Sequence, residues 1–427
     1  MSIYSLEFNA ILYRVIDAHM VCYLDYNATT VMPPEVVDTL TTWATRGNPS
    51  STYPSAKEGK KLMNCFREEI ARHCGFSLDD YAIIFTSGGS ESNSMVISST
   101  IRAFKKAVSN DRPHIITSNV EHDSIRLLLG DFEEEGVDVT YVPVHTYGPR
   151  IGSIDIDALV SVIRPNTCLI TVMAANNETG VINDIKTIGK IAKQKSIPFH
   201  SDAVQLFQKL PFRPLELNVT AFSVSFHKLF GPTGCGLAVI KKDFLEGYNL
   251  RAMIGGSQND HMRGGTECIH NIAAARSAFH INFTDRMTKN AMIRSLKQYM
   301  KELLGKYIVC MYLDEYRHDS NYINSIGTCI VWLCHRESMV QDGTLFLAVH
   351  KHKICNVDIR NELTDDGIYI SIGSACKTTD KKASHVLDGI DLPKKLRPGV
   401  FRISIGDYSS KTDIDMFVRR FLMAIGR

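Results

Sequence analysis

The sequence lacks an excess of charge of either sign. Its 427 residues contain 48 lysines and arginines against 46 aspartates and glutamates, which gives a formal net charge of +2. It also lacks a basic stretch with interleaved aromatic residues, so direct nucleic-acid binding has little support. No apolar run approaches the roughly 18 residues that a membrane-spanning helix needs, and we expect no membrane association. With 44% hydrophobic and 22% charged residues, the composition is that of an ordinary globular protein.

Cysteine is too scarce for a disulfide framework. The chain has 11 cysteines, and none forms a Cys-x-x-Cys pair or a zinc-knuckle spacing. The nearest two, Cys329 and Cys334, lie in an apolar run that is typical of a strand. We therefore expect a reducing compartment, no metal site, and thiols that mostly belong to the core. The expected location is the cytoplasm, with an organelle as the open alternative.

Residues 1–19 match neither common class of targeting segment. They carry one arginine and two acidic residues, Glu7 and Asp17. A transit peptide is rich in arginine and poor in acids, whereas a secretory signal has a basic start and a clean apolar stretch. We predict an N-terminal extension over residues 1–19, because the first strongly patterned segment opens at Met20.

Short apolar runs alternate with helical patterns over the first two thirds of the chain. The runs favour buried strands at 82–86, 114–117, 138–142, 168–173, 197–200, 220–225 and 236–240. Helical spacing of apolar residues predicts helices at 57–74, 91–107, 122–135, 155–163 and 184–195. This alternation predicts an α/β fold with a mainly parallel seven-stranded sheet and helices on both of its faces.

The pattern changes near residue 286, where a long polar helix is followed by strands and helices of more antiparallel character. We therefore predict a large domain over residues 37–285. A smaller α+β domain would combine residues 20–36 with 286–427. No internal repeat or low-complexity tract interrupts the sequence.

Reactive residues follow several predicted strands, where open parallel sheets bind their ligands. The glycine-rich turn at 87–90 begins a helix, and Asp202 and Lys228 each come directly after an apolar run. Alone, such a turn is most often a helix cap, and such a lysine is most simply one that snorkels to solvent from a strand end. Together they match the needs of pyridoxal 5'-phosphate (PLP), which are a covalently binding lysine, an acid for the pyridine nitrogen and a phosphate cradle.

Ten short sequence blocks, in order from Tyr23 onward, carry a resemblance to a known family. They are YLDYNATT (23–30), GNPSS (47–51), FTSGGSESN (85–93), EHDS (121–124), NNETG (176–180), HSDAVQ (200–205), SFHKLFGPTGCG (225–236), RGGTE (263–267), GSAC (373–376) and FRISIG (401–406). In this order they resemble the NifS/IscS-type cysteine desulfurases of the class V aminotransferase superfamily. The resemblance implies the PLP-dependent transferase fold of type I, with the larger domain binding PLP.

The resemblance implies a role for each residue around the cofactor. Lys228 would bind PLP covalently and move protons at the substrate Cα, while Asp202 would keep the pyridine nitrogen protonated. His122 would stack on the ring and could take part in proton transfer, and Gln205 would hydrogen-bond the ring oxygen. Further cofactor contacts would come from Gly89, Ser90, Asn177, Ser225, His227 and, from the neighbouring subunit of a homodimer, Thr266.

The resemblance also implies the substrate, L-cysteine, and the residues that act on it. Asn177 and Arg402 would bind its carboxylate, and an arginine in a strand-like run is an improbable core residue because an unpaired buried charge is costly. Cys376 would take the sulfur as a persulfide and release alanine. The polar segment 377–383 after it contains three lysines, which favour an exposed, mobile loop and a nucleophilic thiolate. The acceptor of the sulfur would be an iron–sulfur scaffold or a tRNA-thiolation protein.

Three positions depart from the family pattern: Tyr53, Ile372 and Asp407, where a histidine, a serine and an arginine are usual. If Asp407 neutralised Arg402, binding of the substrate carboxylate would weaken. One alternative function is that of a selenocysteine lyase or another PLP-dependent C–S lyase, and a second is a non-catalytic sulfur-transfer scaffold. We expect an active enzyme, because every proposed covalent and cofactor contact keeps a competent side chain.

Overall fold

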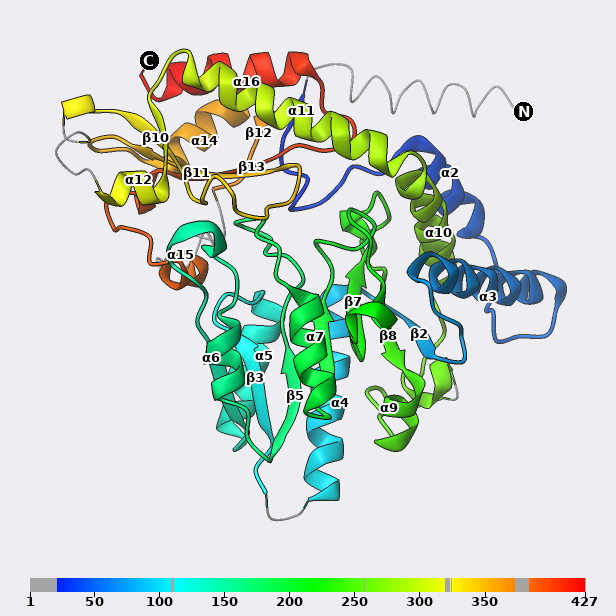
Figure 1. The fold of residues 1–427 in the computed structure, drawn as a ribbon. Coiled ribbons are helices and arrows are strands. Elements are labelled where there is room, and N and C mark those ends of the chain that lie inside the picture. The colour runs from blue at the N-terminus through cyan, green and yellow to red at the C-terminus, as the bar shows by residue number, and fades with distance from the viewer. Residues whose placement is uncertain are drawn as a thin grey trace, which may run out of the picture. The chain divides into compact units, whose positions relative to one another are not determined.

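The computed structural model of the chain describes residues 21–108, 111–256, 258–318, 323, 325–372 and 384–426. These residues divide into two compact units (Figure 1). The large unit comprises Thr29–Thr146 and Arg150–Arg286. The small unit comprises the described residues up to Ala28, Tyr147–Pro149, and those from Met287 onward.

A mainly parallel sheet of seven described strands forms the centre of the large unit (Figure 1). The strands are β2 (Tyr81–Thr86), β3 (His114–Ser118), β4 (Asp138–Val142), β5 (Thr167–Thr171), β6 (Phe199–Asp202), β7 (Ala221–Ser225) and β8 (Gly236–Lys241). Their order across the sheet is β2-β8-β7-β6-β5-β3-β4, with β8 antiparallel to both of its neighbours. The other strands run in one direction, so their carboxyl ends share one edge of the sheet. The predicted fold class is confirmed.

Helices cover both faces of this sheet, as predicted. The predicted helices correspond to α3 (Pro54–Cys74), α4 (Gly89–Ala107), α5 (Asp123–Glu134), α6 (Ile156–Ser161) and α7 (Ile185–Gln194). The structure adds α2 (Pro34–Trp43), α8 (Pro214–Leu217), α9 (Lys242–Gly247), α10 (Ile269–Phe283) and the 3-10 helices η2 (Phe226–Lys228) and η3 (Asn259–His261). A further 3-10 helix, η1 (Gly148–Arg150), has its first two residues in the small unit and its last in the large one. Side chains of β2 alternate between the faces: Ile83 and Phe85 belong to the core that contains α3, and Ala82 and Ile84 to the core that contains α4.

Three of the predicted strands differ from the structure. The run at 197–200 was expected to be a strand, but β6 begins and ends two residues later, at Phe199 and Asp202. The run at 138–142 was expected to be buried, but β4 is an edge strand whose residues are mostly half-buried, whereas the other edge strand, β2, is buried throughout. The run at 168–173 was expected to be strand throughout, but β5 ends at Thr171. Val172 and Met173 continue into a buried loop, which is why the apolar run outlasts the strand.

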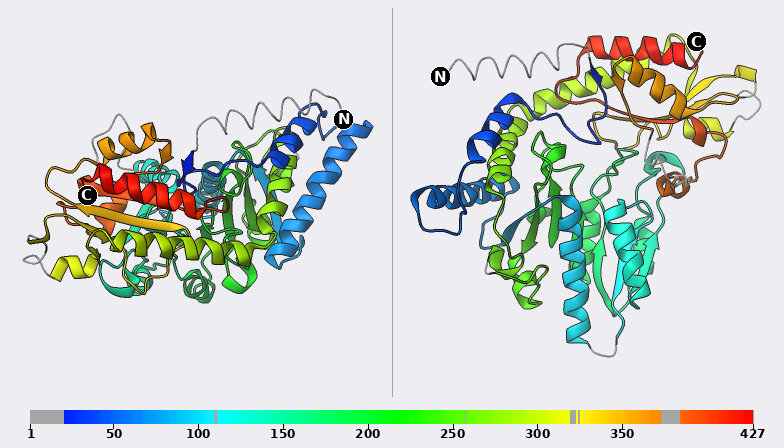
Figure 2. Two further views of the ribbon diagram at one scale, coloured as in Figure 1. Left: turned by 90° about the horizontal axis from the view of Figure 1, so that it is seen from above. Right: turned by 180° about the vertical axis from the view of Figure 1, so that it is seen from behind.

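The small unit has its own core and a four-stranded sheet in the described part of the chain. Its strands are β9 (Cys310–Tyr312), β10 (Cys329–Trp332), β11 (Thr344–His350) and β13 (Val400–Ser404), and β1 (Cys22–Tyr23) pairs separately with β12 (Ile368–Tyr369). β13, β11 and β10 are antiparallel neighbours, and β9 runs parallel to β10. Its helices are α11 (Arg286–Gly305), α12 (Leu313–His318), α14 (Asn356–Asp365), α15 (His385–Gly389), η4 (Arg397–Gly399) and α16 (Lys411–Ala424). Apolar residues of α11, α14 and α16 share one core with this sheet, and Figure 2 shows α11 and α16 lying side by side.

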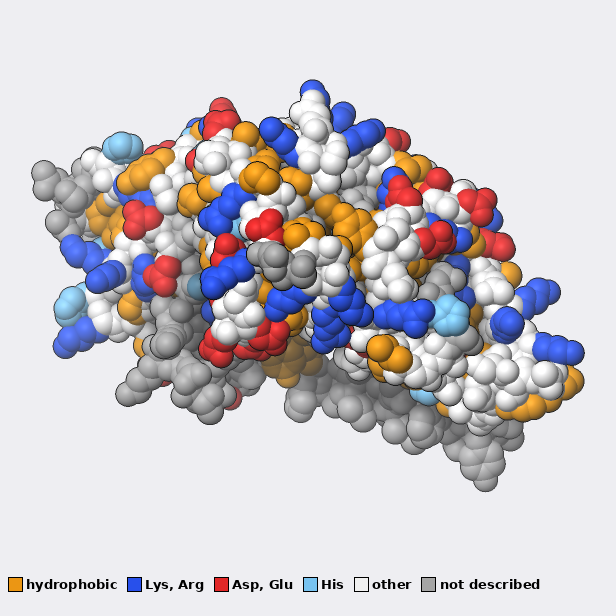
Figure 3. Space-filling model, turned by 90° about the horizontal axis from the view of Figure 1, so that it is seen from below, with side chains coloured by type: hydrophobic (Ala, Val, Ile, Leu, Met, Phe, Trp, Pro, Cys, Tyr) orange, Lys and Arg blue, Asp and Glu red, His pale blue; other side chains and the backbone are white. Residues whose placement is uncertain are grey.

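The surface agrees with the balanced composition. Basic and acidic side chains are interspersed on the face drawn in Figure 3, as a net charge of +2 leads one to expect. Within the described ranges, no helix is both long enough and apolar enough to cross a membrane.

Candidate active site

Several predicted site residues of the large unit gather at the carboxyl edge of its sheet. Asp202 is the last residue of β6, and it lies beside Ser223 of the parallel strand β7. Ser225 ends β7, and Lys228 follows at once in η2. Thr86 ends β2 at the same edge, because β2 runs parallel to β7 through the antiparallel strand β8. The expectation that Asp202 and Lys228 lie at the ends of strands is confirmed.

Gly88 and Gly89 form a tight turn between β2 and α4. Gly88 has a φ of 155°, a conformation that residues with a side chain rarely adopt. A Cβ on Gly89 would lie 2.7 Å from Val204 Cγ2, and a Cβ on Gly236 would lie 2.5 Å from Gly88 Cα. Glycine is therefore required at position 88 by the backbone conformation and at position 236 by the close approach of the two backbones. The N-terminal N–H groups of α4 have no partner within the helix, so the turn suits a phosphate.

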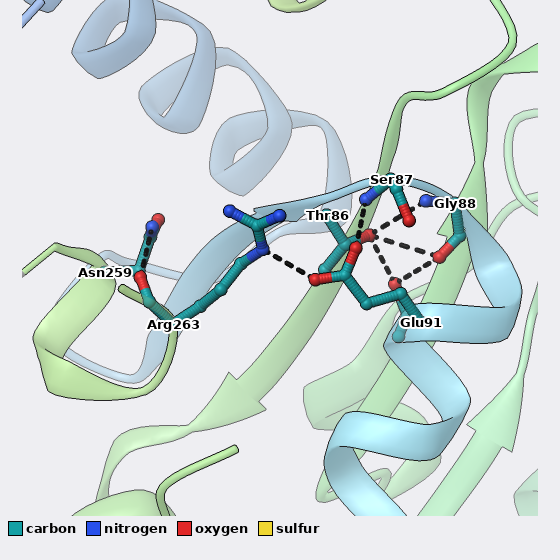
Figure 4. Close-up of polar contacts among 7 residues, drawn as sticks. Thr86, Ser87, Gly88, Glu91, Asn259 and Arg263 are labelled. Carbon is teal, nitrogen blue, oxygen red and sulfur yellow. Dashed lines mark hydrogen bonds and ion pairs between the residues drawn. The ribbon is translucent and has the colours of Figure 1, made fainter. Parts of the chain in front are cut away.

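A hydrogen-bond network braces this turn (Figure 4). Glu91, in the first turn of α4, accepts the N–H of Ser87 at 2.6 Å and pairs with Arg263 Nε at 2.6 Å. Burial raises the pKa of Glu91, but hydrogen bonds from Arg263 and Ser87 outweigh it and hold that pKa below its usual value. Asn259 donates to the carbonyl of Arg263 at 3.2 Å. The Arg263–Glu91 ion pair, called the brace below, therefore links the turn at Gly88 and Gly89, called the phosphate turn below, to the segment that carries Thr266. Thr266 is exposed in the single chain.

Asp202 is buried, and N–H groups donate to both of its carboxylate oxygens. Oδ1 accepts the backbone N–H of Val204 at 2.9 Å, and Oδ2 accepts Nδ2 of Asn93 at 2.8 Å. These two bonds fix the orientation of the carboxylate. A fixed orientation is what an acid that pairs with the pyridine nitrogen of PLP would need. Asn93 was not predicted as a site residue, although it ends the FTSGGSESN block.

The turn that carries Lys228 is fixed by two threonines of the NATT segment. The carbonyl of His227 accepts the hydroxyls of Thr29 and Thr30 at 3.1 and 2.9 Å, and Thr30 Oγ1 accepts the N–H of Phe230 at 2.6 Å. Burial, together with the Lys228 cation, lowers the pKa of His227 to about 4, so its imidazole is neutral near pH 7. Sequence reasoning recognised the NATT segment but missed this role.

His122 and Glu121 precede α5 and differ sharply in environment. His122 is exposed and caps α5, because its Nδ1 accepts the N–H of Ser124 at 3.1 Å. Glu121 is buried, and its carboxyl accepts the hydroxyl of Ser118 and the N–H of Met173. Burial raises the pKa of Glu121 to about 8. The neighbourhood of His122 therefore contains a carboxyl group that is neutral near pH 7.

The other predicted cofactor contacts occupy varied positions. Gln205 is buried after β6 and accepts Lys209 Nζ at 3.1 Å. Ser90 is exposed in the first turn of α4, and Asn177 is half-buried in the loop after β5. Their contacts with a cofactor or a substrate stay predictions.

In the small unit, Arg402 lies buried in β13 and forms an ion pair. Its Nη2 lies 2.7 Å from Oδ1 of Asp25, in the block that begins at Tyr23. Asp407 lies 3.6 Å from Lys289 Nζ. Asp25 is therefore an acid in ion-pair contact with Arg402, a partner that the sequence did not indicate. The predicted nucleophile, Cys376, lies outside the described residues.

The ten described cysteines are free thiols, and most belong to buried or half-buried positions. Burial raises the pKa of Cys74 and of Cys168 to about 12. Cys268 differs from the expected core position, because it is exposed at the start of α10 with its Sγ 3.2 Å from His270 Nε2. Within the described ranges, no cluster of histidine, cysteine and acidic residues could hold a metal ion.

The residues at the sheet edge fit PLP in three respects. The turn at Gly88 and Gly89 is a cradle that a Cβ would fill. The carboxylate of Asp202 is held in place at the end of β6, next to β7, the strand that Lys228 follows. The Oδ1 atom of Asn93 is buried and has no hydrogen-bond partner among the described residues. A bound group or a water molecule would complete such an acceptor.

Comparison with known proteins agrees with this architecture. The model of the aminotransferase class-V family matches residues 22–417. The chain is 35% identical to the cysteine desulfurase IscS of Dictyoglomus turgidum, covering 92% of this chain and 91% of the relative. It is 32% identical to the selenocysteine lyase of Xenopus tropicalis, covering 93% and 91%.

Solved structures give the same result. A NifS-like protein superposes with a TM-score of 0.77 at 25% identity, covering 94% of this chain and 98% of that one. SspA in complex with cysteine superposes with a TM-score of 0.73 at 27% identity, covering 91% and 99%. Because the family match and these relatives extend over nearly the whole chain, the chain belongs to the class-V aminotransferase family, in its NifS/IscS-type group of PLP-dependent enzymes.

Proposed function

We propose that the protein is a cysteine desulfurase, which converts L-cysteine to L-alanine and leaves a persulfide on Cys376. The observation that carries the proposal is the arrangement at one sheet edge of the glycine turn, the doubly held Asp202 and Lys228. It is supported by the 35% identity to a protein named as a cysteine desulfurase. The assignment of Cys376 rests on the GSAC block of the sequence.

The residues of the large unit would hold the cofactor and move a proton. Bound at this edge, PLP supplies an electron-withdrawing ring that stabilises the negative charge left when a proton leaves the substrate Cα. Asp202 would hold the proton on the ring nitrogen, because Asn93 and Val204 keep its carboxylate in one orientation. The amine of Lys228 would take the proton from Cα.

The sulfur step would use Cys376 as the nucleophile, with Arg402 and Asn177 binding the substrate carboxylate. The thiolate of Cys376 would attack the substrate sulfur, so that a new S–S bond forms while the C–S bond breaks. The electron pair of the broken bond would remain on carbon, where a proton completes alanine. The products balance as L-alanine and one persulfide, and no external oxidant is needed.

The test is an assay of both products with L-cysteine and a thiol reductant. The wild-type protein should release alanine and sulfide in equal amounts. Lys228→Ala and Cys376→Ala should each abolish sulfide release. Cys268→Ala is the control, since it removes an exposed thiol that has no role in the proposal, and it should keep wild-type turnover. Undiminished sulfide release by Cys376→Ala would refute the assignment of the nucleophile.

A selenocysteine lyase is the second candidate, favoured by the 32% identity to a protein of that name. The kcat/KM values for L-cysteine and L-selenocysteine separate the two functions. A desulfurase should turn over L-cysteine efficiently, whereas a lyase specific for selenocysteine should turn it over negligibly.

We further propose that the enzyme is a homodimer in which Thr266 reaches the phosphate site of the neighbouring subunit. Thr266 is exposed in the single chain, and the Arg263–Glu91 brace ties its segment to the phosphate turn. Mixing Lys228→Ala with Thr266→Ala subunits should restore activity above that of either variant alone, because one mixed site regains both residues. No restoration in proven heterodimers would refute the exchange. The persulfide would pass to an acceptor protein, in a reducing compartment that we propose is the cytoplasm.

A further inference from the structure

A chain of three hydrogen bonds joins His122 to Asp202 within the large unit. Ser124 Oγ lies 2.9 Å from His122 Nδ1, and Asn93 Nδ2 lies 3.0 Å from the same Ser124 Oγ. The same Asn93 nitrogen lies 2.8 Å from Asp202 Oδ2. The residues come from three elements, since Asn93 is in α4, His122 and Ser124 begin α5, and Asp202 ends β6.

The chemistry of each group fixes the direction of every bond in this chain. The Asp202 carboxylate accepts hydrogen bonds, so the NH₂ group of Asn93 must face it. The second hydrogen of that NH₂ group goes to Ser124 Oγ, which leaves the Ser124 hydroxyl hydrogen for His122 Nδ1. The network therefore runs outward from the Asn93 amide in two directions.

The backbone determines where His122 carries its proton. The Ser124 N–H, which can only donate, points at His122 Nδ1 at 3.1 Å. Nδ1 therefore accepts, and the proton of the neutral ring resides on Nε2. The Ser124 hydroxyl supports the same assignment, because its hydrogen is directed to Nδ1.

We propose that Asn93 and Ser124 are positioning residues that hold His122 as the Nε2–H tautomer and aim Asp202 through one shared network. This inference rests on the proposed function, in which Asp202 holds the proton on the ring nitrogen, and on the expectation that His122 stacks on the ring. Because Nε2 is already protonated, His122 presents a hydrogen-bond donor at Nε2 and not the base that takes the first proton. That first step is left to Lys228.

The burial of Asn93 makes this amide important for cofactor binding. Asn93 is 0% exposed, so water cannot replace the bond that it donates to Asp202. Hydrogen bonds to charged groups are the strong ones, and removal of this bond by Asn93→Ala should weaken PLP binding by about 10- to 100-fold. Ser124→Ala should weaken it by a few-fold, because the bond from Asn93 to Asp202 remains.

The first experiment measures PLP dissociation constants by fluorescence titration of the apoprotein. If the network acts as one unit, Asn93→Ala/Ser124→Ala should bind PLP no more weakly than Asn93→Ala alone. Ser124→Thr keeps the hydroxyl and should bind as the wild type does. Ser99→Ala is the matched control, since Ser99 is buried in the same helix and, among the described residues, its hydroxyl bonds only to the carbonyls of Met95 and Val96. Wild-type affinity in Asn93→Ala would overturn the proposal.

The second experiment reads the tautomer without any turnover. In ¹⁵N-histidine-labelled protein, with the His122 signals identified by their loss in His122→Gln, Nδ1 should resonate as an unprotonated nitrogen and Nε2 as a protonated one. Ser124→Ala should keep the same tautomer, because its backbone N–H still donates to Nδ1, and Ser124→Thr should match the wild type. A wild-type ring protonated on Nδ1 would overturn the proposal. If PLP bound and the tautomer matched but L-cysteine gave no sulfide, the proposed function would fail while this inference stood.

Discussion

Replacement of Glu121 by glutamine should remove a pH-dependent loss of stability from the folded protein. The side chain is 1% exposed and accepts hydrogen bonds from Ser118 and Met173. Burial raises its pKa from 4.5 to about 8 against the effect of these bonds, and the Asp202 charge adds to the rise. Glutamine has nearly the same shape but cannot ionise, so it mimics the protonated acid.

The sign of the effect follows from the direction of the shift. In the unfolded chain the carboxyl loses its proton near pH 4.5, whereas in the folded protein it keeps the proton up to about pH 8. Between these values the folded state binds one more proton, so this group lowers the free energy of unfolding by up to about 1.4 kcal/mol per pH unit as pH rises. The contribution is fully present below pH 4.5 and is lost through pH 8, a difference of about 5 kcal/mol over the window.

The assay is urea unfolding of the apoprotein at pH 5.5, 6.5 and 7.5. The free energy of unfolding of Glu121→Gln, relative to the wild type, should rise steadily over this range, because the wild type alone carries the loss. Glu134→Gln, at an exposed position of α5, is the matched control and should run parallel to the wild type. Parallel curves for Glu121→Gln and the wild type would refute a neutral carboxyl at this position.

Three further predictions concern the cofactor and substrate contacts. Gly88→Ala places a side chain at a φ of 155°, which costs about 1–3 kcal/mol, and it should weaken PLP binding in fluorescence titration while leaving α4 intact by circular dichroism. Arg263→Gln removes the brace on Glu91 and should weaken binding of PLP but not of pyridoxal, which has no phosphate; equal losses would contradict the brace. Asp25→Asn should lower the free energy of unfolding by about 3 kcal/mol. It should also lower the KM for L-cysteine, because Asp25 no longer neutralises the positive charge of Arg402; an unchanged KM would count against carboxylate binding there.

Much of the fold of the large unit follows from local pattern, because each buried strand is a short apolar run and each surface helix has one apolar face. Helix α10 escaped prediction for a physical reason. It packs against α2 and α3, and buried alanines such as Ala273, Ala274 and Ala275 follow one another along it, so no single apolar stripe marks it as a helix.

The sequence predicted the site residues that lie at the end of a strand or directly after it, such as Asp202 and Lys228. Its supporting contacts were not. Asp25 and Arg402 are 377 positions apart, and Asn93 reaches Asp202 across 109 positions. Such partners become neighbours only when the sheets form, and a single sequence carries no local signal for them.

The most direct test of the central claim is the mass of the intact protein after incubation with PLP and L-cysteine in the absence of a reductant. The account predicts a gain of one sulfur atom, mapped by peptide analysis to Cys376 and absent from Lys228→Ala. A protein that gains no sulfur, or gains it on another thiol such as the exposed Cys268, would contradict the account.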